Sequence, residues 1–191
     1  MLHLVLASAS PRRKELLQKL NIPFSTFSPH ADESFSPNLS PNEIVTMLAL
    51  RKANMASAQF PESIVIGSDT IVVNNDKVLG KPANRQEAKQ MLEQLSGQTH
   101  SVYTGVAVVY GKISKTFYEK TDVEFWELSD ADIERYLDSG EPFDKAGAYG
   151  IQGLGALHVK SIKGDYYAVV GLPISRLSRT LSSMGLGSPP E

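Results

Sequence analysis

The chain has 191 residues, a net charge of -2 at pH 7 and no cysteine. This length suits one domain, or one domain with an elaborated lobe, and is enough to bury a proper core. The charge indicates no nucleic-acid surface, and the lack of cysteine excludes a disulfide framework, a thiolate nucleophile and a cysteine-based zinc site. No apolar run reaches membrane-spanning length and the start does not resemble a signal peptide, so we expect a cytoplasmic protein with neither nucleic acid nor membrane as partner.

The N-terminal stretch predicts a buried strand, a short polar turn and a helix. Residues 2–7 form an apolar run of strand length, and Ser10-Pro11 places a hydroxyl N-cap before a proline at the first helical position. The turn from Ser8 onward would present free backbone N–H groups at the positive end of a helix dipole, with Arg12 and Arg13 beside them. This combination favours a bound phosphate. The alternative is a plain helix cap with two solvated arginines.

A short strand over residues 24–28 precedes a polar, proline-punctuated loop over residues 29–39. The loop carries two adjacent acids, Asp32 and Glu33, in its middle. The next helix should start at Ser40, because Glu43 three residues later completes a capping box.

A lysine falls on the apolar face of that helix. At about 100° per residue, one arc collects six apolar residues: Ile44, Val45, Leu48, Ala49, Met55 and Ala56. Lys52 lies inside this arc. Either its side chain runs out along the helix to solvent, or it reaches a buried anion.

Residues 63–73 are the most hydrophobic segment and predict a central strand that is apolar on both faces. Asp69 interrupts this strand, and burying a lone carboxylate costs several kcal/mol unless it is paired or binds a metal. Gly67, two residues earlier, leaves space beside it for a ligand. The alternative is an aspartate that caps a neighbouring loop. A turn at residues 74–77 should return the chain as a hairpin strand, Val78-Leu79.

Lys81 follows that hairpin strand, close enough in sequence to return to the same site, although it also fits an exposed loop lysine. Asn84 should cap a helix that ends before Gly97. Two long strands over residues 101–110 and 113–128 suggest an antiparallel pair, and Ser129 should start a short helix.

The remaining segments complete an α/β pattern. The glycine-rich stretch 141–155 has neither a strand nor a helix period. Residues 156–162 and 166–171 predict a closing hairpin, a last helix starts at Leu172-Pro173, and residues 187–191 predict a frayed tail. The succession predicts a mixed, twisted sheet flanked by helices rather than a strict βαβ series.

The charged residues suggest phosphoryl chemistry. The N-terminal turn, Lys52 and Lys81 suit a polyphosphate, whereas Glu33 and Asp69 would repel it unless a divalent cation lay between. Oxygen donors without cysteine or clustered histidine favour Mg²⁺ or Mn²⁺. No P-loop pattern occurs, and no Ser, Cys or His has the partners of a covalent nucleophile. Attack by metal-activated water is therefore favoured, with the carboxylates holding the metal or accepting the proton.

The chain also resembles the Maf family of nucleoside triphosphate pyrophosphatases, named for inhibition of septum formation. Seven motifs carry the resemblance, in the family's order and over nearly the whole chain. They are Ala7-Ser8-Ala9-Ser10-Pro11-Arg12-Arg13, Asp32-Glu33, Lys52-Ala53, Gly67-Ser68-Asp69-Thr70, Gly80-Lys81-Pro82, Leu95-Ser96-Gly97 and Asp144-Lys145-Ala146-Gly147-Ala148-Tyr149-Gly150-Ile151-Gln152-Gly153.

The resemblance implies hydrolysis of a nucleoside triphosphate to the monophosphate and pyrophosphate with a divalent metal. It implies a fold like that of inosine triphosphate pyrophosphatases (the Maf and Ham1 type), with residues 1–191 forming one domain of two lobes around a central cleft. Asp69 would be the proton acceptor and a candidate metal ligand, and Glu33 would help hold the metal. Phosphates would be contacted by Arg13, Lys52 and Lys81, and Ser8 of the N-terminal turn joins this candidate set.

Three positions concern which nucleobase the site would accept. Arg12, Thr70 and Gln152 match the family branch that acts on dTTP and UTP, whereas a branch that favours 7-methyl-GTP differs there. The Gln152 amide offers both a donor and an acceptor, which suits a uracil or thymine edge. Other hypotheses are a nucleotide-binding regulatory module that affects cell division through a partner without catalysis, and a plain structural domain. The sequence leaves open whether the chain forms a homodimer.

Overall fold

The structure is a computed structural model that describes residues 3–186. Within them lie strands β1 (Leu4–Ala7), β2 (Phe24–Phe27), β3 (Ile64–Asn74), β4 (Lys77–Leu79), β5 (Thr99–Tyr110), β6 (Ile113–Phe125) and β7 (Val159–Lys163). The α-helices are α1 (Pro11–Gln18), α2 (Pro41–Gln59), α3 (Arg85–Leu95), α4 (Asp130–Asp138), α5 (Tyr166–Val170) and α6 (Ile174–Ser183). Three 3-10 segments complete the list: η1 (Glu141–Asp144), η2 (Ala146–Ala148) and η3 (Gly153–His158).

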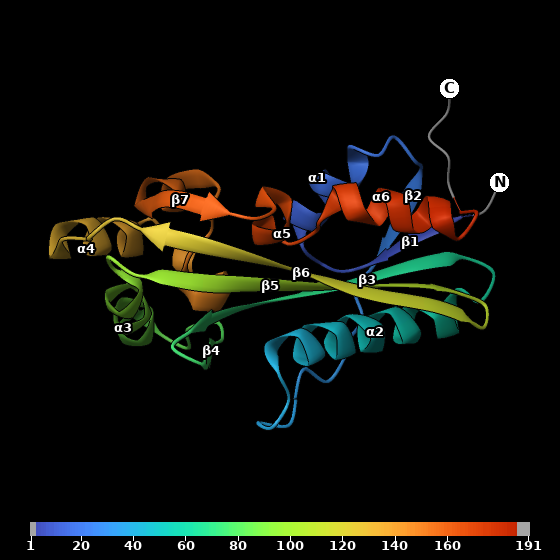
Figure 1. The fold of residues 1–191 in the computed structure, drawn as a ribbon, viewed down its shortest axis with the longest axis horizontal. Coiled ribbons are helices and arrows are strands. Elements are labelled where there is room, and N and C mark those ends of the chain that lie inside the picture. Colours follow the sequence, from blue (N-terminus) through green and yellow to red (C-terminus); the bar gives the residue numbers. More distant parts are fainter. Residues whose placement is uncertain (1–2, 187–191) are drawn as a thin grey trace. The chain divides into compact units, whose positions relative to one another are not determined.

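These strands form a mixed sheet in the order β2-β1-β3-β5-β6-β7, with β4 paired to β3 (Figure 1). β1 runs parallel to β2 and β3, whereas β4 is antiparallel to β3 and β7 is antiparallel to β6. The predicted α/β fold with a mixed sheet flanked by helices is confirmed. Position 2 of the first predicted strand and the predicted tail at 187–191 lie outside the described residues.

The chain divides into two compact units. The first contains Met1–Asp69, Thr104–Glu119 and Gly171–Glu191, and the second contains Thr70–Tyr103 and Lys120–Val170. Strands β3, β5 and β6 contribute residues to both units. The expectation of one domain with two lobes around a central cleft stays a prediction.

In the first unit, α2 packs directly on the backbone of the sheet. A Cβ at Gly67 would overlap the Ala49 carbonyl oxygen and lie 2.9 Å from the Ala53 nitrogen, and a Cβ at Gly105 would overlap the Val45 carbonyl oxygen. Figure 1 shows α2 on one side of these strands and α1 and α6 on the other. Because no side chain separates helix from strand, the position of α2 along β3 is closely fixed.

The apolar face of α2 agrees with the predicted arc except at one residue. Met55 is 40% exposed, whereas Ala53 is buried in its place. The reason is the close approach to Gly67, which centres the contact on small residues and leaves Met55 at the margin of the face. Ala49, Ala53 and Ala56 accordingly pack against β-strand side chains such as Val5 and Val65.

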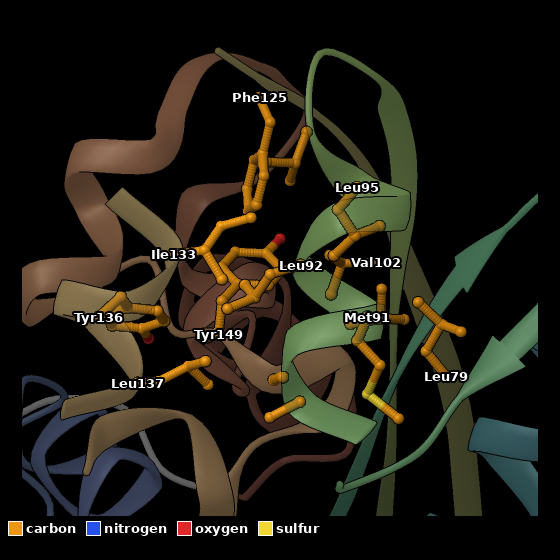
Figure 2. Close-up of a cluster of buried hydrophobic side chains, with 14 residues drawn as sticks. Leu79, Met91, Leu92, Leu95, Val102, Phe125, Ile133, Tyr136, Leu137 and Tyr149 are labelled. Carbon is orange, nitrogen blue, oxygen red and sulfur yellow. The ribbon is translucent and has the colours of Figure 1, made fainter. Parts of the chain in front are cut away.

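The second unit has its own apolar core between α3 and α4 (Figure 2). Leu92 and Leu95 of α3 gather with Ile133 of α4 around Phe125 and Tyr149. In this way the glycine-rich stretch, which contains Tyr149, is tied to regular helices. The stretch folds as the three short 3-10 segments, and Gly147 (φ 68°) and Gly153 (φ 64°) take the left-handed conformation that glycine permits.

The predicted closing hairpin is wrong in its second half. Residues 166–170 form helix α5, not a strand. The Asp165 carboxylate accepts a hydrogen bond from the Tyr167 N–H at 2.8 Å, so it caps the helix start. The aromatic and β-branched residues of this segment favour a strand in isolation, and the cap overrides that preference.

Local turn and cap chemistry was predicted correctly elsewhere. Ser10 caps α1 and accepts from the Arg13 N–H at 3.4 Å, and the Asn84 side chain accepts from the Glu87 N–H at 2.9 Å at the start of α3. Asn75 and Asp76 both have positive φ (48° and 61°), which suits the tight turn between β3 and β4.

Candidate active site

A buried ion pair joins β3 to α2 in the first unit. The Lys52 Nζ lies 2.5 Å from the Asp69 Oδ1, and the two side chains are only 12% and 11% exposed. The lysine on the apolar face of α2 therefore reaches a buried anion rather than solvent. Because an unpaired buried carboxylate is costly, this ammonium is what permits Asp69 in a central strand.

Lys52 also contacts Glu33 from the polar loop before α2. The Lys52 Nζ lies 2.8 Å from the Glu33 Oε1, and the Glu33 side chain is 61% exposed. The lysine therefore lies between two carboxylates, one buried and one at the surface. The three groups carry one more negative charge than positive, so together they attract a further cation.

The N-terminal turn brings a second cation to this unit. The Arg13 Nη1 lies 3.5 Å from the Ser8 Oγ, which also accepts from the Ser10 N–H at 3.1 Å. Burial lowers the pKa of the Arg13 guanidinium, and the nearby charge of Arg12 lowers it further, whereas the Asp69 and Glu33 carboxylates raise it. Arg13 therefore lies within the electrostatic reach of both carboxylates.

The backbone carbonyl of Gly171, which no sequence motif indicates, holds this arrangement together. The Gly171 carbonyl oxygen accepts from the Arg13 Nε at 2.8 Å and from the Ser68 Oγ at 3.0 Å. Gly171 has a positive φ of 128°, which glycine tolerates. The contact links the N-terminal turn, β3 and the segment before α6. In the sequence, Gly171 is only the end of a predicted strand before the last helix.

Arg51, the neighbour of Lys52 on α2, was also missed. Its guanidinium donates to the backbone carbonyls of Asp32 and Ser34, on either side of Glu33. The available signal was adjacency to Lys52, since consecutive helix residues project about 100° apart and can reach one nearby loop from the same turn.

The structure places the predicted residues in two groups. Ser8, Arg12, Arg13, Glu33, Lys52 and Asp69 belong to the first unit; Thr70, Lys81 and Gln152 belong to the second. Within the second unit, the Gly147 N–H donates to the carbonyl of Gly80 at 3.0 Å, so the segment carrying Lys81 is tied to the glycine-rich stretch that carries Gln152. A shared site for both groups stays a prediction.

The two carboxylates fit a hard divalent cation. Glu33 and Asp69 both approach Lys52, and both offer only oxygen donors. Within residues 3–186, no group of three or more His, Cys, Asp or Glu side chains is arranged to hold a metal ion. An ion here would complete its coordination with water or ligand oxygens, which is how Mg²⁺ is commonly bound beside phosphates.

These features define an α/β protein with a site of paired carboxylates and cations suited to a phosphate-bearing ligand. A family model described as Maf-like protein matches residues 3–184, and the chain belongs to the Maf family. Among residues 3–186, no helix has the length and apolarity needed to cross a bilayer.

Relatives match over almost the full length. A Halalkalibacterium halodurans protein is 53% identical over 185 residues, and a Bacillus cereus protein is 50% identical over 186 residues; each match covers 97% of both chains. Both relatives are named dTTP/UTP pyrophosphatase. Among solved structures, the Staphylococcus aureus Ham1 protein matches 64% of this chain and 71% of its own, at 14% identity and a TM-score of 0.46.

Proposed function

We propose that this chain is a nucleoside triphosphate pyrophosphatase that hydrolyses dTTP and UTP to the monophosphate and pyrophosphate. The observation that carries the proposal is Lys52 between the carboxylates of Asp69 and Glu33, with Arg13 close to both. Relatives about half identical to this chain over 97% of its length carry the name of this activity.

Phosphate binding would come from the first unit's cations. The Arg13 guanidinium, the Ser8 hydroxyl and the Lys52 ammonium are donors that suit phosphate oxygens. Lys81 from the second unit would add a further cation. These groups hold the triphosphate and stabilise charge that develops on the leaving pyrophosphate.

Glu33 and Asp69 would hold a divalent cation, Mg²⁺ or Mn²⁺, which supplies phosphate charge neutralisation and a more acidic water when bound. In the reaction, a water oxygen attacks the α-phosphorus and the bond to the bridging α,β oxygen breaks. Pyrophosphate leaves with that electron pair. The Asp69 carboxylate takes the water's proton, and the Lys52 contact orients the carboxylate for that task.

Base selection would rest on Arg12, Thr70 and Gln152. The Glu141 carboxylate accepts from the Leu154 N–H at 3.1 Å, which fixes the turn directly after Gln152. A primary amide on a fixed turn matches the mixed donor and acceptor edge of uracil or thymine. The proposal includes a cytoplasmic location, as expected for an enzyme of the nucleotide pool. A house-cleaning role, arrest of septum formation and a homodimer stay predictions.

The test is product analysis with the purified chain and Mg²⁺, using dTTP, UTP, CTP, ATP, GTP and 7-methyl-GTP in ¹⁸O-labelled water. We expect pyrophosphate release, fastest with dTTP and UTP, and label in the nucleoside monophosphate. Orthophosphate release, or label in pyrophosphate, would refute attack at the α-phosphorus. Tight dTTP binding without turnover would instead support the regulatory module.

A further inference from the structure

The loop that carries Glu33 is held by a residue with no assigned role. The Arg51 Nη1 donates to the Ser34 carbonyl oxygen at 3.0 Å and to the Asp32 carbonyl oxygen, and it lies 3.6 Å from the Asp32 Oδ2. The two carbonyls flank Glu33 in the chain. One guanidinium therefore fixes the backbone on both sides of this glutamate.

The loop also stabilises itself around the same residue. The Asp32 carboxylate accepts from the Ser34 N–H at 2.9 Å and from the Ser34 Oγ at 2.7 Å. These bonds close a turn with Glu33 at its tip.

Global stability does not explain this arrangement. The Arg51 and Asp32 side chains are both partly open to solvent, and ion pairs in such positions contribute little to folding. What the contacts do fix is the place of the Glu33 side chain, which is itself largely exposed and has Lys52 as an ion-pair partner. Arg51 and Lys52 are consecutive on α2, so one short piece of helix holds both the backbone and the carboxylate of Glu33.

We propose that Arg51 is a positioning residue, which fixes the loop at residues 32–34 so that the Glu33 carboxylate stays beside Lys52 and the proposed cation site. This role rests on the proposed function, because it gives Glu33 its task. Without the two hydrogen bonds from the Arg51 Nη1, the loop would sample other conformations. Glu33 would then meet the cation in only a fraction of them.

The experiment compares Arg51→Gln and Arg51→Lys with a matched control, Arg176→Gln. Arg176 makes the same kind of contact in the same unit, donating to the Tyr118 carbonyl oxygen at 3.0 Å and the Glu119 carboxylate at 2.8 Å, but its partners lie outside the 32–34 loop. Two readouts are used: dTTP turnover against Mg²⁺ concentration, and hydrogen exchange of the peptide spanning the loop.

For Arg51→Gln we expect the Mg²⁺ concentration for half-maximal turnover to rise about 10-fold, the usual scale for a lost supporting contact. The KM for dTTP at saturating Mg²⁺ should change less than twofold, and loop exchange should accelerate. Arg51→Lys should recover only part of both effects, since a flexible ammonium does not direct two N–H bonds as the Nη1 of a planar guanidinium does. Arg176→Gln should match the wild type in Mg²⁺ dependence and in loop exchange.

Arg51→Gln with wild-type Mg²⁺ dependence, or with wild-type loop exchange, would overturn the inference. Full recovery by Arg51→Lys would overturn guanidinium geometry as the cause, because charge alone would then suffice. If the wild-type chain fails to hydrolyse dTTP, the proposed function falls, and hydrogen exchange of the loop alone decides whether Arg51 orders it.

Discussion

Each compact unit buries titratable side chains, but the two units treat them in opposite ways. In the first unit, the Asp69 carboxylate pairs with the Lys52 ammonium at 2.5 Å. In the second, His100 is 2% exposed, donates to or accepts from the Tyr149 hydroxyl at 2.6 Å, and packs edge-on against Phe125 with ring centroids 5.0 Å apart. Its Nδ1 has no hydrogen-bond partner within residues 3–186.

The difference separates the candidate active site from a structural core. Opposite charges compensate one another in the first unit, so the groups remain ionic and can exchange partners with a charged ligand. Burial lowers the pKa of His100 to about 4, so this ring stays neutral at pH 7 and serves packing. In this chain, a countercharge therefore distinguishes the buried Asp69 from the buried His100.

The largest expected effect comes from separating the two elements that make the ion pair. Gly67→Ala places a Cβ against the Ala49 backbone, so α2 must move away from β3. We expect a loss of about 3 kcal/mol or more in the free energy of unfolding, the upper range for overpacking. Chemical denaturation measures it. Gly80→Ala is the control, because a Cβ there meets no atom within 4 Å; equal stability of the two variants would contradict the close packing.

Removing the countercharge should cost nearly as much. Lys52→Met leaves Asp69 buried and unpaired, which we expect to lower the free energy of unfolding at pH 7 by about 2–3 kcal/mol. The double variant Lys52→Met/Asp69→Asn should recover much of the loss. Lys89→Met, at a more exposed ion pair with Glu134, should change stability far less. A loss as large as that of Lys52→Met would show that burial does not make the Lys52–Asp69 pair more important for stability.

The stability of the second unit should depend on pH because burial lowers the pKa of His100. The pKa of His100 is about 4 in the folded chain and about 6.5 when unfolded, so the unfolded state takes up a proton first as the pH falls. Stability should therefore decrease by about 2 kcal/mol between pH 7 and pH 5. The variant His100→Phe/Tyr149→Phe removes both hydrogen-bond partners and should flatten most of this slope. Some slope should remain, because burial also lowers the pKa of His158. An unchanged slope in the double variant would contradict a neutral buried His100.

The smallest expected effect concerns substrate choice in the second unit. Gln152→Glu leaves an acceptor where the amide also donates, so kcat/KM for dTTP and UTP should fall roughly 10-fold or more. Steady-state kinetics across the triphosphate panel measures this. A uniform loss on every nucleotide would show that Gln152 does not read the base.

Local chemistry in the sequence predicted much of the fold. Ser10-Pro11 and Asn75-Asp76 act through neighbours in the chain, so their cap and turn could be predicted directly. Lys52 stood out because a charge on an apolar helix face needs a buried partner. Helix α5 was missed because its cap, Asp165, outweighs the strand preference of the residues after it.

The missed site residues depend on tertiary structure. Arg51 donates to a backbone carbonyl of the loop at residues 32–34. The Gly171 carbonyl accepts a hydrogen bond from Arg13, which lies near the other end of the chain. The acceptor in both contacts is a backbone carbonyl, and because every residue has one, the sequence does not indicate which carbonyl is used. Such partners become visible only when the chain is folded.

The central claim is that the Asp69 carboxylate in the first unit performs the proton transfer. The most direct measurement is single-turnover hydrolysis of dTTP by Asp69→Asn, together with nucleotide affinity and near-UV circular dichroism. We predict a rate lower by roughly 10³-fold, with native tertiary structure and dTTP affinity retained within a few fold. Hydrolysis by Asp69→Asn within 10-fold of the wild-type rate would contradict the account.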